Sequence, residues 1–390
     1  MKKKIIFITE ALWVGGIESA LCNLLNRLDY DRYEVTCLIL RDSRELAERL
    51  PPQCRLIVAD RQHAVSFPKM YRYKQLYNIM EEPQHAAKPR RFIWHMLRML
   101  LRAPEARLYA AYIKEQLGCE HFDTAVIYSD RAAETAIRAV FADRFLMLYH
   151  HGAMRKEYHD AYGYRKAENI IAVSEAQAEK LRKYRPQYAK KIIAINNIID
   201  VDTVRKKSTE TPDKAYPKDG FNIVSCGRLS PAKGMDIAID ACARLVWDGL
   251  ENIHWWIIGG GPEEAALRAQ IRALGMENNV TLLGMQGNPY PYIRSADLYV
   301  QPSRFEGHCV TVLEARLLAV PILATGSAAA EQIEDGETGL LCDSDAASLA
   351  DAVKRLYRAP ELRQAFRDAL RRYDFEHDNA AIMQKIYALL

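Results

Sequence analysis

The hydrophobic positions of the chain form short apolar runs that alternate with stretches of helical periodicity. Short runs rich in Ile, Val and Leu predict buried strands, and the longer periodic stretches between them predict helices. In the first half the predicted strands are Lys4–Thr9, Tyr33–Leu40, Arg55–Ala59, Thr124–Tyr128, Arg144–Tyr149, Ile170–Ser174 and Lys191–Asn196. Strands separated by helices favour right-handed βαβ units and a parallel sheet.

The alternation restarts after a polar, proline-containing stretch at Ser208–Gly220, which indicates a linker or a domain edge. The predicted strands of the second half are Asn222–Cys226, His254–Ile258, Val280–Leu283, Leu298–Gln301, Pro321–Thr325 and Gly339–Cys342. Its predicted helices are Met235–Gly249, Glu263–Leu274, Val312–Ala319 and Ala346–Tyr357.

This order of elements predicts an α/β protein with two Rossmann-like α/β/α domains that face each other across a cleft. We expect the first domain to span 1–200 and the second to span 201–374. A last helix at 375–390 is expected to pack back towards the first domain. Open parallel sheets bind ligands beyond the carboxyl ends of their strands, so chemistry is expected in the cleft.

The composition is that of an ordinary globular protein, with 49% hydrophobic and 27% charged residues among 390. It excludes collagen-like, coiled-coil and wholly disordered classes. No apolar run reaches the roughly 18 residues of a membrane-spanning helix, and the apolar run Ile5–Ile8 is too short for a signal-peptide core. The eight cysteines are scattered without a C-x-x-C pair. We therefore expect a reduced, cytoplasmic protein.

Charge is distributed unevenly between the two halves. Residues 1–200 hold 33 Lys and Arg against 24 Asp and Glu, whereas the remainder holds 21 against 26. One basic cluster runs from Lys88 to Lys114, within an insertion near 62–118, and a second runs from Lys180 to Lys191. A basic half indicates an anionic partner for the first domain.

The first basic cluster is interleaved with apolar and aromatic residues around Trp94. A basic amphipathic helix with an aromatic anchor is typical of segments that lie on an anionic membrane surface. The alternative is a helix that packs on the core and presents a solvated face. No nucleic-acid recognition motif accompanies the charge, so nucleic acid is not an expected partner.

Two cations occupy the predicted strand-to-helix loop that begins the second half. Arg228 and Lys233 lie in the sequence Gly227–Gly234, directly after the first predicted strand. A forked guanidinium and an ammonium point charge together suit a diphosphate group.

Two carboxylates flank the start of the helix after the Leu298–Gln301 strand. Glu306 precedes the helix and Glu314 follows eight residues later, inside its first turns. The backbone N–H groups of His308 to Thr311 are expected to open this helix and to add donors for the same anion. The two carboxylates could address the two ends of an extended ligand, such as a sugar and a ribose diol.

No residue pattern predicts a metal or cofactor. The histidines and cysteines lack zinc-ligand spacing, and no G-x-S-x-G nucleophile elbow is present. Asp200-Val201-Asp202 has the D-x-D form of some metal sites, but its place at the domain crossover favours a linker turn.

The ordered set of these motifs resembles the family-4 retaining glycosyltransferases of the GT-B fold, most closely over 222–342. The family's E-x7-E signature matches Glu306-Gly307 through Glu314-Ala315. The resemblance implies that Glu306 binds the donor sugar and supports its anomeric centre, while Glu314 holds the nucleotide ribose. It also implies that Arg228 and Lys233 bind the donor diphosphate.

In the first domain the family's G-G-x-E loop matches Gly15-Gly16-Ile17-Glu18. The family histidine near the reacting sugar best matches His151, with His150 as the alternative because neighbours on a strand face opposite ways. The candidate catalytic residues are thus Glu306, His151, Arg228 and Lys233. The candidate donor-binding residues are Gly15, Gly16, Arg228, Lys233, Gly260, Glu306, Gly307, His308, Cys309, Val310 and Glu314.

Two features depart from the family pattern. The family often has an aromatic residue and a glycine where this chain has His308 and Cys309, which affects the expected sugar more than the reaction. The basic insertion near 62–118 lies outside the family's common core.

The resemblance implies a metal-independent retaining hexosyltransferase, with a UDP-sugar favoured as donor. The expected acceptor is a saccharide, especially a lipid-linked one, in bacterial surface polysaccharide assembly such as capsule. The expected location is the cytoplasm, at the inner face of the membrane. A nucleotide-sugar 2-epimerase of the same fold and a non-catalytic partner subunit remain alternatives.

Overall fold

The computed structural model describes residues 1–60, 107–128, 133–150, 161–214, 216–217, 220–326 and 329–390. Most of the basic insertion and His151 lie outside the described residues. The predictions made for them remain predictions.

The first domain is built on a parallel sheet whose strands follow the order β3-β2-β1-β4-β5-β6-β7. The strands are β1 (Lys3–Thr9), β2 (Tyr33–Ile39), β3 (Arg55–Val58), β4 (His121–Ile127), β5 (Phe141–Tyr149), β6 (Asn169–Ala172) and β7 (Ile192–Ala194). Its described helices are α1 (Gly16–Leu25), α4 (Ala133–Ala139), α5 (Ala161–Lys166), α6 (Glu175–Tyr184) and a helical stretch at 107–116, with the short helices η1 (Ala47–Arg49) and η4 (Pro186–Lys191).

Helices cover both faces of this sheet, which explains the continuous apolar runs in the sequence. Ile6 and Ile8 of β1 belong to the core on one face, and Ile5 and Phe7 belong to the core on the other. All four side chains are at most 1% exposed.

The second domain has a parallel sheet in the order β10-β9-β8-β11-β12-β13. The strands are β8 (Phe221–Cys226), β9 (Ile253–Ile258), β10 (Val280–Gly284), β11 (Leu298–Gln301), β12 (Ile322–Thr325) and β13 (Gly339–Cys342). The helices are α7 (Val201–Lys207), α8 (Met235–Trp247), α9 (Glu264–Leu274), α10 (Tyr290–Ser295), α11 (Val310–Leu317), α12 (Ala346–Arg358) and α13 (Pro360–Arg371), with the short helices η5 (Pro231–Lys233) and η6 (Ala330–Gln332).

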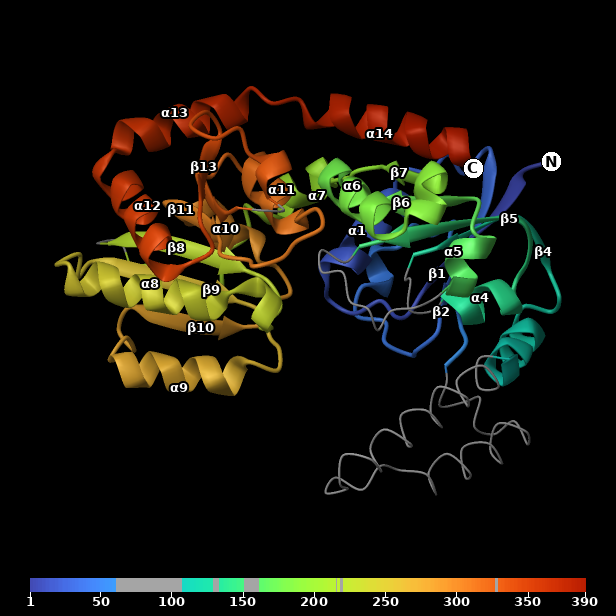
Figure 1. Ribbon diagram of the computed structural model, residues 1–390, viewed down its shortest axis with the longest axis horizontal. Coiled ribbons are helices and arrows are strands. Elements are labelled where there is room, and N and C mark those ends of the chain that lie inside the picture. The colour runs from blue at the N-terminus through green and yellow to red at the C-terminus, as the bar shows by residue number, and fades with distance from the viewer. Residues whose placement is uncertain (61–106, 129–132, 151–160, 215, 218–219, 327–328) are drawn as a thin grey trace, which may run out of the picture.

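The two sheets confirm the predicted α/β class with paired parallel-sheet domains (Figure 1). In each sheet the strand order reverses beside the first strand, between β1 and β4 and between β8 and β11. Such reversals leave a crevice at the carboxyl ends of the strands. The loops that follow β1, β8 and β11 therefore begin at these two crevices.

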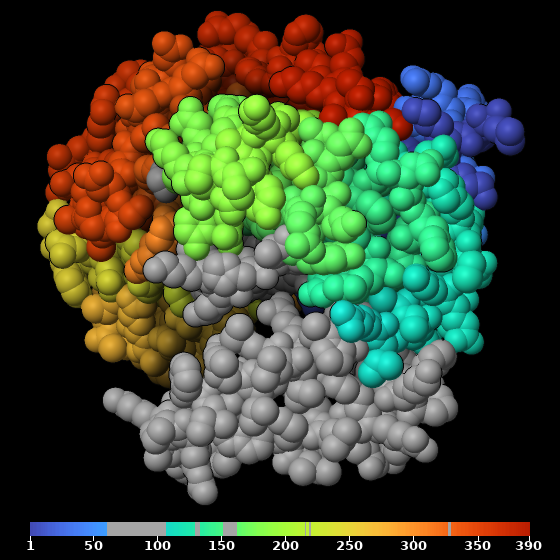
Figure 2. Space-filling view, turned by 45° about the vertical axis from the view of Figure 1, so that its right-hand side comes forward, coloured from blue at the N-terminus to red at the C-terminus, as the bar shows by residue number. Residues whose placement is uncertain are grey.

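The last helix, α14 (Phe375–Leu389), leaves the second domain and runs along the first, where the two chain ends lie close together (Figures 1 and 2). Its buried Asn379 accepts a hydrogen bond from Ile199 N at 3.2 Å and donates one to Ile199 O at 2.9 Å. Met383 and Leu390 join the core of the first domain. The chain between the domains is thus tied to a helix that contacts both.

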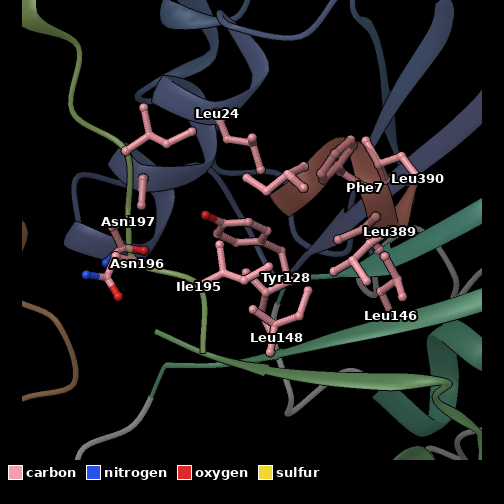
Figure 3. Close-up of a pocket in the computed structure, with 15 residues that line it drawn as sticks. Phe7, Leu24, Tyr128, Leu146, Leu148, Ile195, Asn196, Asn197, Leu389 and Leu390 are labelled. Atoms are coloured by element: carbon pink, nitrogen blue, oxygen red, sulfur yellow. The ribbon is translucent and has the colours of Figure 1, made fainter. Parts of the chain in front are cut away.

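An apolar cavity of about 40 Å³ lies where this helix closes over the first domain (Figure 3). Phe7, Leu24, Tyr128 and Leu390 are among its lining residues. A cavity of this size holds little more than one small molecule such as water. It lies at the junction between the C-terminal helix and the core of the first domain.

None of the helices among the described residues is long and apolar enough to cross a membrane.

Candidate functional site

Lys233 and Glu306 form an ion pair between the loops that follow β8 and β11. Lys233 Nζ lies 2.6 Å from Glu306 Oε1, and the two side chains are 26% and 9% exposed. Gly234 makes the close approach of these loops possible. Its φ of 63° is left-handed, and a Cβ there would collide with the carbonyl oxygen of Pro302.

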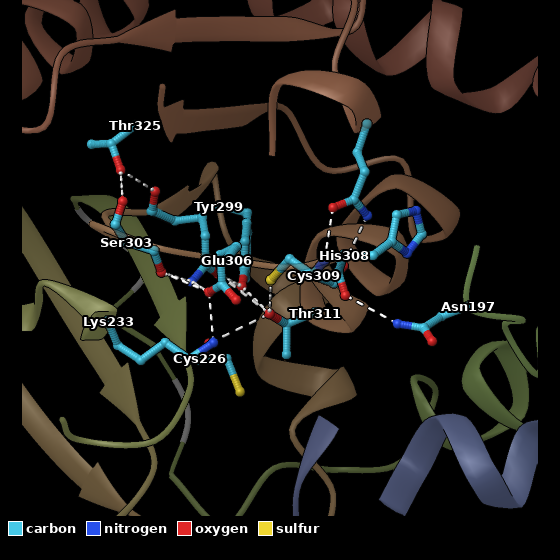
Figure 4. A network of polar contacts seen from close by, with 12 residues as sticks. Asn197, Cys226, Lys233, Tyr299, Ser303, Glu306, His308, Cys309, Thr311 and Thr325 are labelled. Carbon is cyan, nitrogen blue, oxygen red and sulfur yellow. Dashed lines mark hydrogen bonds and ion pairs between the residues drawn. The ribbon is translucent and has the colours of Figure 1, made fainter. Parts of the chain in front are cut away.

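Three donors converge on one oxygen of Glu306. Besides Lys233, Ser303 Oγ lies 2.7 Å and Gln301 Nε2 lies 3.1 Å from Oε1 (Figure 4). Among the described residues no hydrogen bond is made to Oε2. One oxygen of the carboxylate is therefore held by the protein, and the other is not engaged by the described residues.

The groups that hold Glu306 are themselves held. Tyr299 OH lies 2.6 Å from Gln301 Oε1 and 2.7 Å from Thr311 Oγ1. Thr325 Oγ1 donates to Ser303 O at 2.6 Å. Buried polar networks of this kind fix side-chain positions when every member is paired.

The environment of Lys233 keeps its ammonium charged. Burial lowers its pKa, but the charge and hydrogen bond of Glu306, together with Cys309 and Cys226, outweigh burial and raise the pKa above its usual value. Arg228, five residues earlier in the same loop, is exposed. The loop after β8 thus offers one fixed cation and one accessible cation.

Glu314 lies on α11 in a very different environment from Glu306. It is 6% exposed and accepts a hydrogen bond from Tyr290 OH at 3.0 Å. Burial raises its pKa to about 7, although Tyr290 and the charge of Arg49 oppose the shift. At neutral pH this carboxyl group is therefore divided between its protonated and ionised forms.

The N-terminus of α11 opens beside the ion pair, with Cys309 as its N-cap. Cys309 N donates to Gln332 Oε1 at 2.8 Å, so this amide is already used. Cys309 Sγ lies 3.2 Å from Thr311 Oγ1, and the thiol is buried. Val310 begins the helix and lies near the first domain, 3.9 Å from where a Cβ on Gly16 would be.

His308 turns its ring away from Lys233 and Glu306 (Figure 4). The ring is 9% exposed, and burial together with Arg316 lowers its pKa to about 3, so it is neutral. Its carbonyl oxygen accepts a hydrogen bond from Asn197 Nδ2 at 3.1 Å. The predicted donor residue His308 thus contacts the interdomain segment rather than the cluster around Glu306.

The loop after β1 and the start of α1 lie near Arg228 of the second domain. Glu18 is 5% exposed, and burial raises its pKa to about 7 while the charge of Arg228 in the other domain opposes the shift. A Cβ on Gly15 would collide with the Glu18 carboxylate. Gly15, the N-cap of α1, therefore leaves room for the Glu18 carboxylate, which lies in electrostatic reach of Arg228.

Gly307 lies against the backbone of the first domain. A Cβ at this position would lie 2.6 Å from His150 O and 3.0 Å from Val173 Cγ2. Only a residue without a side chain allows the two domains to approach this closely. The structure thus places His150 next to the Glu306 loop, and the adjacent His151 lies outside the described residues.

Gly260 lies in the loop after β9, where a Cβ would meet Met285 Cγ at 3.0 Å. Its carbonyl oxygen accepts a hydrogen bond from Leu229 N at 2.9 Å, which joins it to the loop that carries Arg228 and Lys233.

The sequence prediction missed several residues of this site. Gln301 and Ser303 hold Glu306, Tyr290 holds Glu314, and Gln332 holds Cys309. Gln301 carries a signal that could have revealed it, because it is a polar residue at the carboxyl end of an otherwise apolar strand. No group of three or more His, Cys, Asp or Glu able to hold a metal occurs within the described part of the chain.

Family models match both halves of the chain. Residues 14–203 match the family described as Glycosyltransferase Family 4, and residues 206–373 match Glycosyl transferases group 1. The chain is a glycosyltransferase family 4-like protein of the GT-B fold.

Several curated proteins are similar to parts of this GT-B protein. One is the N-acetylgalactosamine-N,N'-diacetylbacillosaminyl-diphospho-undecaprenol 4-alpha-N-acetylgalactosaminyltransferase of Campylobacter jejuni, 32% identical over 53% of this chain and 55% of that protein. Another is the lipopolysaccharide core biosynthesis glycosyltransferase LpsE of Rhizobium meliloti, 30% identical over 38% and 42% of the respective chains. The matches span only about half the length of these curated relatives.

Solved structures match the GT-B fold over nearly the whole chain. Anabaena HepE in complex with UDP and glucose superposes with a TM-score of 0.72 and 18% identity, covering 99% of this chain and 100% of that chain. S. aureus TarM, as a mutant in complex with Fondaparinux, alpha-GlcNAc-glycerol and UDP, gives 0.71 and 14%, covering 99% of both. At these identities the likeness shows the fold.

The raised pKa of Glu314 predicts a pH-dependent effect of Glu314→Gln on stability. The folded state retains its proton up to about pH 7, whereas the unfolded state loses it near 4.5, so this group lowers stability as pH rises through that window. Glutamine stays neutral and can still accept from Tyr290. At pH 8 the variant should gain up to about 3 kcal/mol relative to its effect at pH 4.5.

Thermal unfolding midpoints at pH 4.5, 6 and 8 measure this effect. The exposed Glu337 provides the matched control, since Glu337→Gln should give the same small difference at every pH. A Glu314→Gln difference that is independent of pH would contradict the assigned environment.

Proposed function

We propose that the protein is a retaining glycosyltransferase that moves a sugar from a nucleotide diphosphate sugar to an acceptor hydroxyl. The observation that carries this proposal is the Lys233–Glu306 pair between the carboxyl ends of β8 and β11, with Arg228 in the same loop and the first domain's glycine loop opposite. This arrangement combines fixed positive charge for a leaving group with a carboxylate for a cationic sugar.

Lys233 and Arg228 stabilise the departing diphosphate. The raised pKa of Lys233 keeps its charge at any physiological pH, and the exposed Arg228 is free to form a forked contact with phosphate oxygens. The α11 N-terminus adds its dipole. Because fixed cations perform this role, we expect transfer to proceed without a divalent metal ion.

Glu306 supports the anomeric carbon as positive charge develops there. Its Oε1 is fixed by three donors, which leaves Oε2 for the sugar. A preorganised carboxylate in a site closed to water stabilises an oxocarbenium-like transition state electrostatically. By the family resemblance we assign Glu314 to the ribose at the other end of the donor and His151 to the reacting sugar.

The reaction breaks the bond from the anomeric carbon to the β-phosphate oxygen and forms a bond to the acceptor oxygen. The acceptor proton moves to the departing phosphate oxygen, which releases the nucleoside diphosphate. The acceptor oxygen attacks the anomeric carbon from the same face that the diphosphate leaves, so the anomeric configuration is retained.

The comparisons support the choice of donor and acceptor. HepE and TarM were solved with UDP, and HepE also with UDP-glucose. The Campylobacter relative is named for an acceptor on diphospho-undecaprenol, and other relatives are named for lipopolysaccharide and O-antigen biosynthesis. We therefore propose a UDP-sugar donor and a lipid-linked saccharide acceptor in assembly of a bacterial surface polysaccharide such as capsule.

A lipid-linked acceptor requires the enzyme to work at a membrane surface. The basic cluster at Lys180–Lys191 lies on α6 and η4 of the first domain, where Lys180, Lys183 and Lys190 are exposed. The other basic cluster, 88–114, lies mostly outside the described residues. We propose peripheral binding of the first domain to the anionic cytoplasmic face of the membrane.

Lys233→Ala should lower kcat for transfer by about 100- to 1,000-fold, because one fixed charge on the leaving group is lost. The measurement is release of nucleoside diphosphate from a panel of UDP-, GDP- and ADP-sugars, with and without an undecaprenyl-diphosphate saccharide. Wild-type release is expected with a UDP-sugar and acceptor, unchanged by EDTA. The exposed Lys385 provides the control, and Lys385→Ala should be as active as wild type.

Other outcomes of this assay contradict the proposal. Near-normal transfer by a folded Lys233→Ala variant would remove the diphosphate role of this residue. Conversion of the donor to its epimer without acceptor would indicate a 2-epimerase, and no turnover of any donor would indicate a non-catalytic subunit. A product with inverted anomeric configuration, read by NMR, would overturn the retaining mechanism.

Neutralising Arg90, Arg91 and Arg98 to glutamine should weaken binding to anionic vesicles, measured by sedimentation, by about 100-fold, since each basic residue near the surface contributes about 1 kcal/mol and about 1.4 kcal/mol is a factor of ten. The control neutralises the exposed Arg355, Arg358 and Arg372 of the second half, which should leave binding unchanged. Vesicles of phosphatidylcholine alone should bind neither variant nor wild type. Binding that is equal for the two triple variants would contradict the membrane role of the insertion.

A further inference from the structure

A carboxylate of the second domain caps a helix of the first. Glu331 lies on η6, and its side chain accepts hydrogen bonds from the backbone N–H groups of Glu175, at 3.1 Å, and Ala176. These are the first two residues of α6. The side chain of the helix's own N-cap, Ser174, accepts from Gln177 N at 3.2 Å.

This contact has the chemistry of a helix cap supplied by another domain. The first N–H groups of a helix have no partner within the helix and favour negative charge. Glu331 satisfies two of them across the cleft. These bonds require η6 of the second domain to lie against the start of α6.

The next residue, Gln332, clamps the loop that carries Glu306. Gln332 Oε1 accepts from Cys309 N at 2.8 Å, and its Nε2 donates to Cys309 O at 2.9 Å. Gln332 is 3% exposed. Cys309 is the N-cap of α11 and follows Glu306 by three residues.

Two further contacts join the same loop to the first half of the chain. Gly307 packs against His150 O, and His308 O accepts from Asn197 Nδ2 at 3.1 Å. The Glu306 loop therefore contacts the first domain at His150 and the interdomain segment at Asn197, and Gln332, the residue next to Glu331, holds it at Cys309.

We propose that Glu331 and Gln332 are positioning residues that couple domain closure to the placement of Glu306. Glu331 forms its bonds to α6 on closure, and Gln332, adjacent in the chain, holds the N-cap of α11 in register with it. The inference rests on the proposed transferase function for its effect on turnover. Its structural part does not depend on that function.

Glu331→Ala should lower kcat for transfer by about 10- to 100-fold, because small misplacements of a reacting group carry costs of this size. KM for the donor should change by less than kcat, since Arg228, Lys233 and Glu314 are untouched. Hydrolysis of the donor, as a fraction of turnover, should rise because the cleft closes less completely. Glu331→Gln keeps one acceptor oxygen and should recover part of the loss.

Hydrogen–deuterium exchange provides a readout that does not require turnover. In Glu331→Ala, peptides covering the start of α6 and peptides covering 305–312 should both exchange faster than in wild type. In Gln332→Ala only the second set should change markedly. Glu337→Ala, at an exposed position shortly after η6 in the chain, is the matched control and should leave both sets unchanged.

The outcomes separate this inference from the proposed function. If no donor is turned over but Glu331→Ala loosens both sets of peptides, the transferase proposal fails and the coupling stands. If the peptides at 305–312 are unchanged in Glu331→Ala, the coupling is wrong whatever the activity. Equal falls in kcat for Glu331→Ala and Glu337→Ala would also overturn it.

Discussion

The contact between Lys233 and Glu306 is the interaction on which the site depends. It joins the loop after β8 to the loop after β11, and these strands are neighbours at the point where the sheet order reverses. Gln301, Ser303 and Thr325 build the network around it from strands β11 and β12 and the intervening loop. The ion pair keeps both a cation and an anion in a partly buried cleft, where either alone would be costly.

The second constraint is the close approach of the two domains. Gly307 reaches the backbone at His150, Gly16 lies opposite Val310, and Arg228 acts electrostatically on Glu18. Each of these contacts joins residues far apart in the sequence. All three contacts require the two domains to lie close together at this edge. The helix α14 provides a second connection between the domains, through Asn379 and the apolar residues that enter the core of the first domain.

The sequence predicted the fold class because burial on both faces of a parallel sheet leaves long apolar runs, as in β1 and β9. It also located the loops that carry Lys233 and Glu306, because the resemblance rested on motifs at strand ends. It could not predict Gln332 or Glu331, because common polar residues carry no local pattern and their partners lie 23 and 156 positions away. The ring of His308 could not be placed either, since burial in the interdomain region decides where it points.

We propose that Lys233 and Arg228 bind a pyrophosphoryl group through fixed positive charge. A crystal structure with bound UDP tests it most directly. We expect β-phosphate oxygens within hydrogen-bond distance of Lys233 Nζ and the Arg228 guanidinium, with the ribose hydroxyls near Glu314. A nucleotide bound away from both cations, or a diphosphate held only through a metal ion, would contradict this proposal.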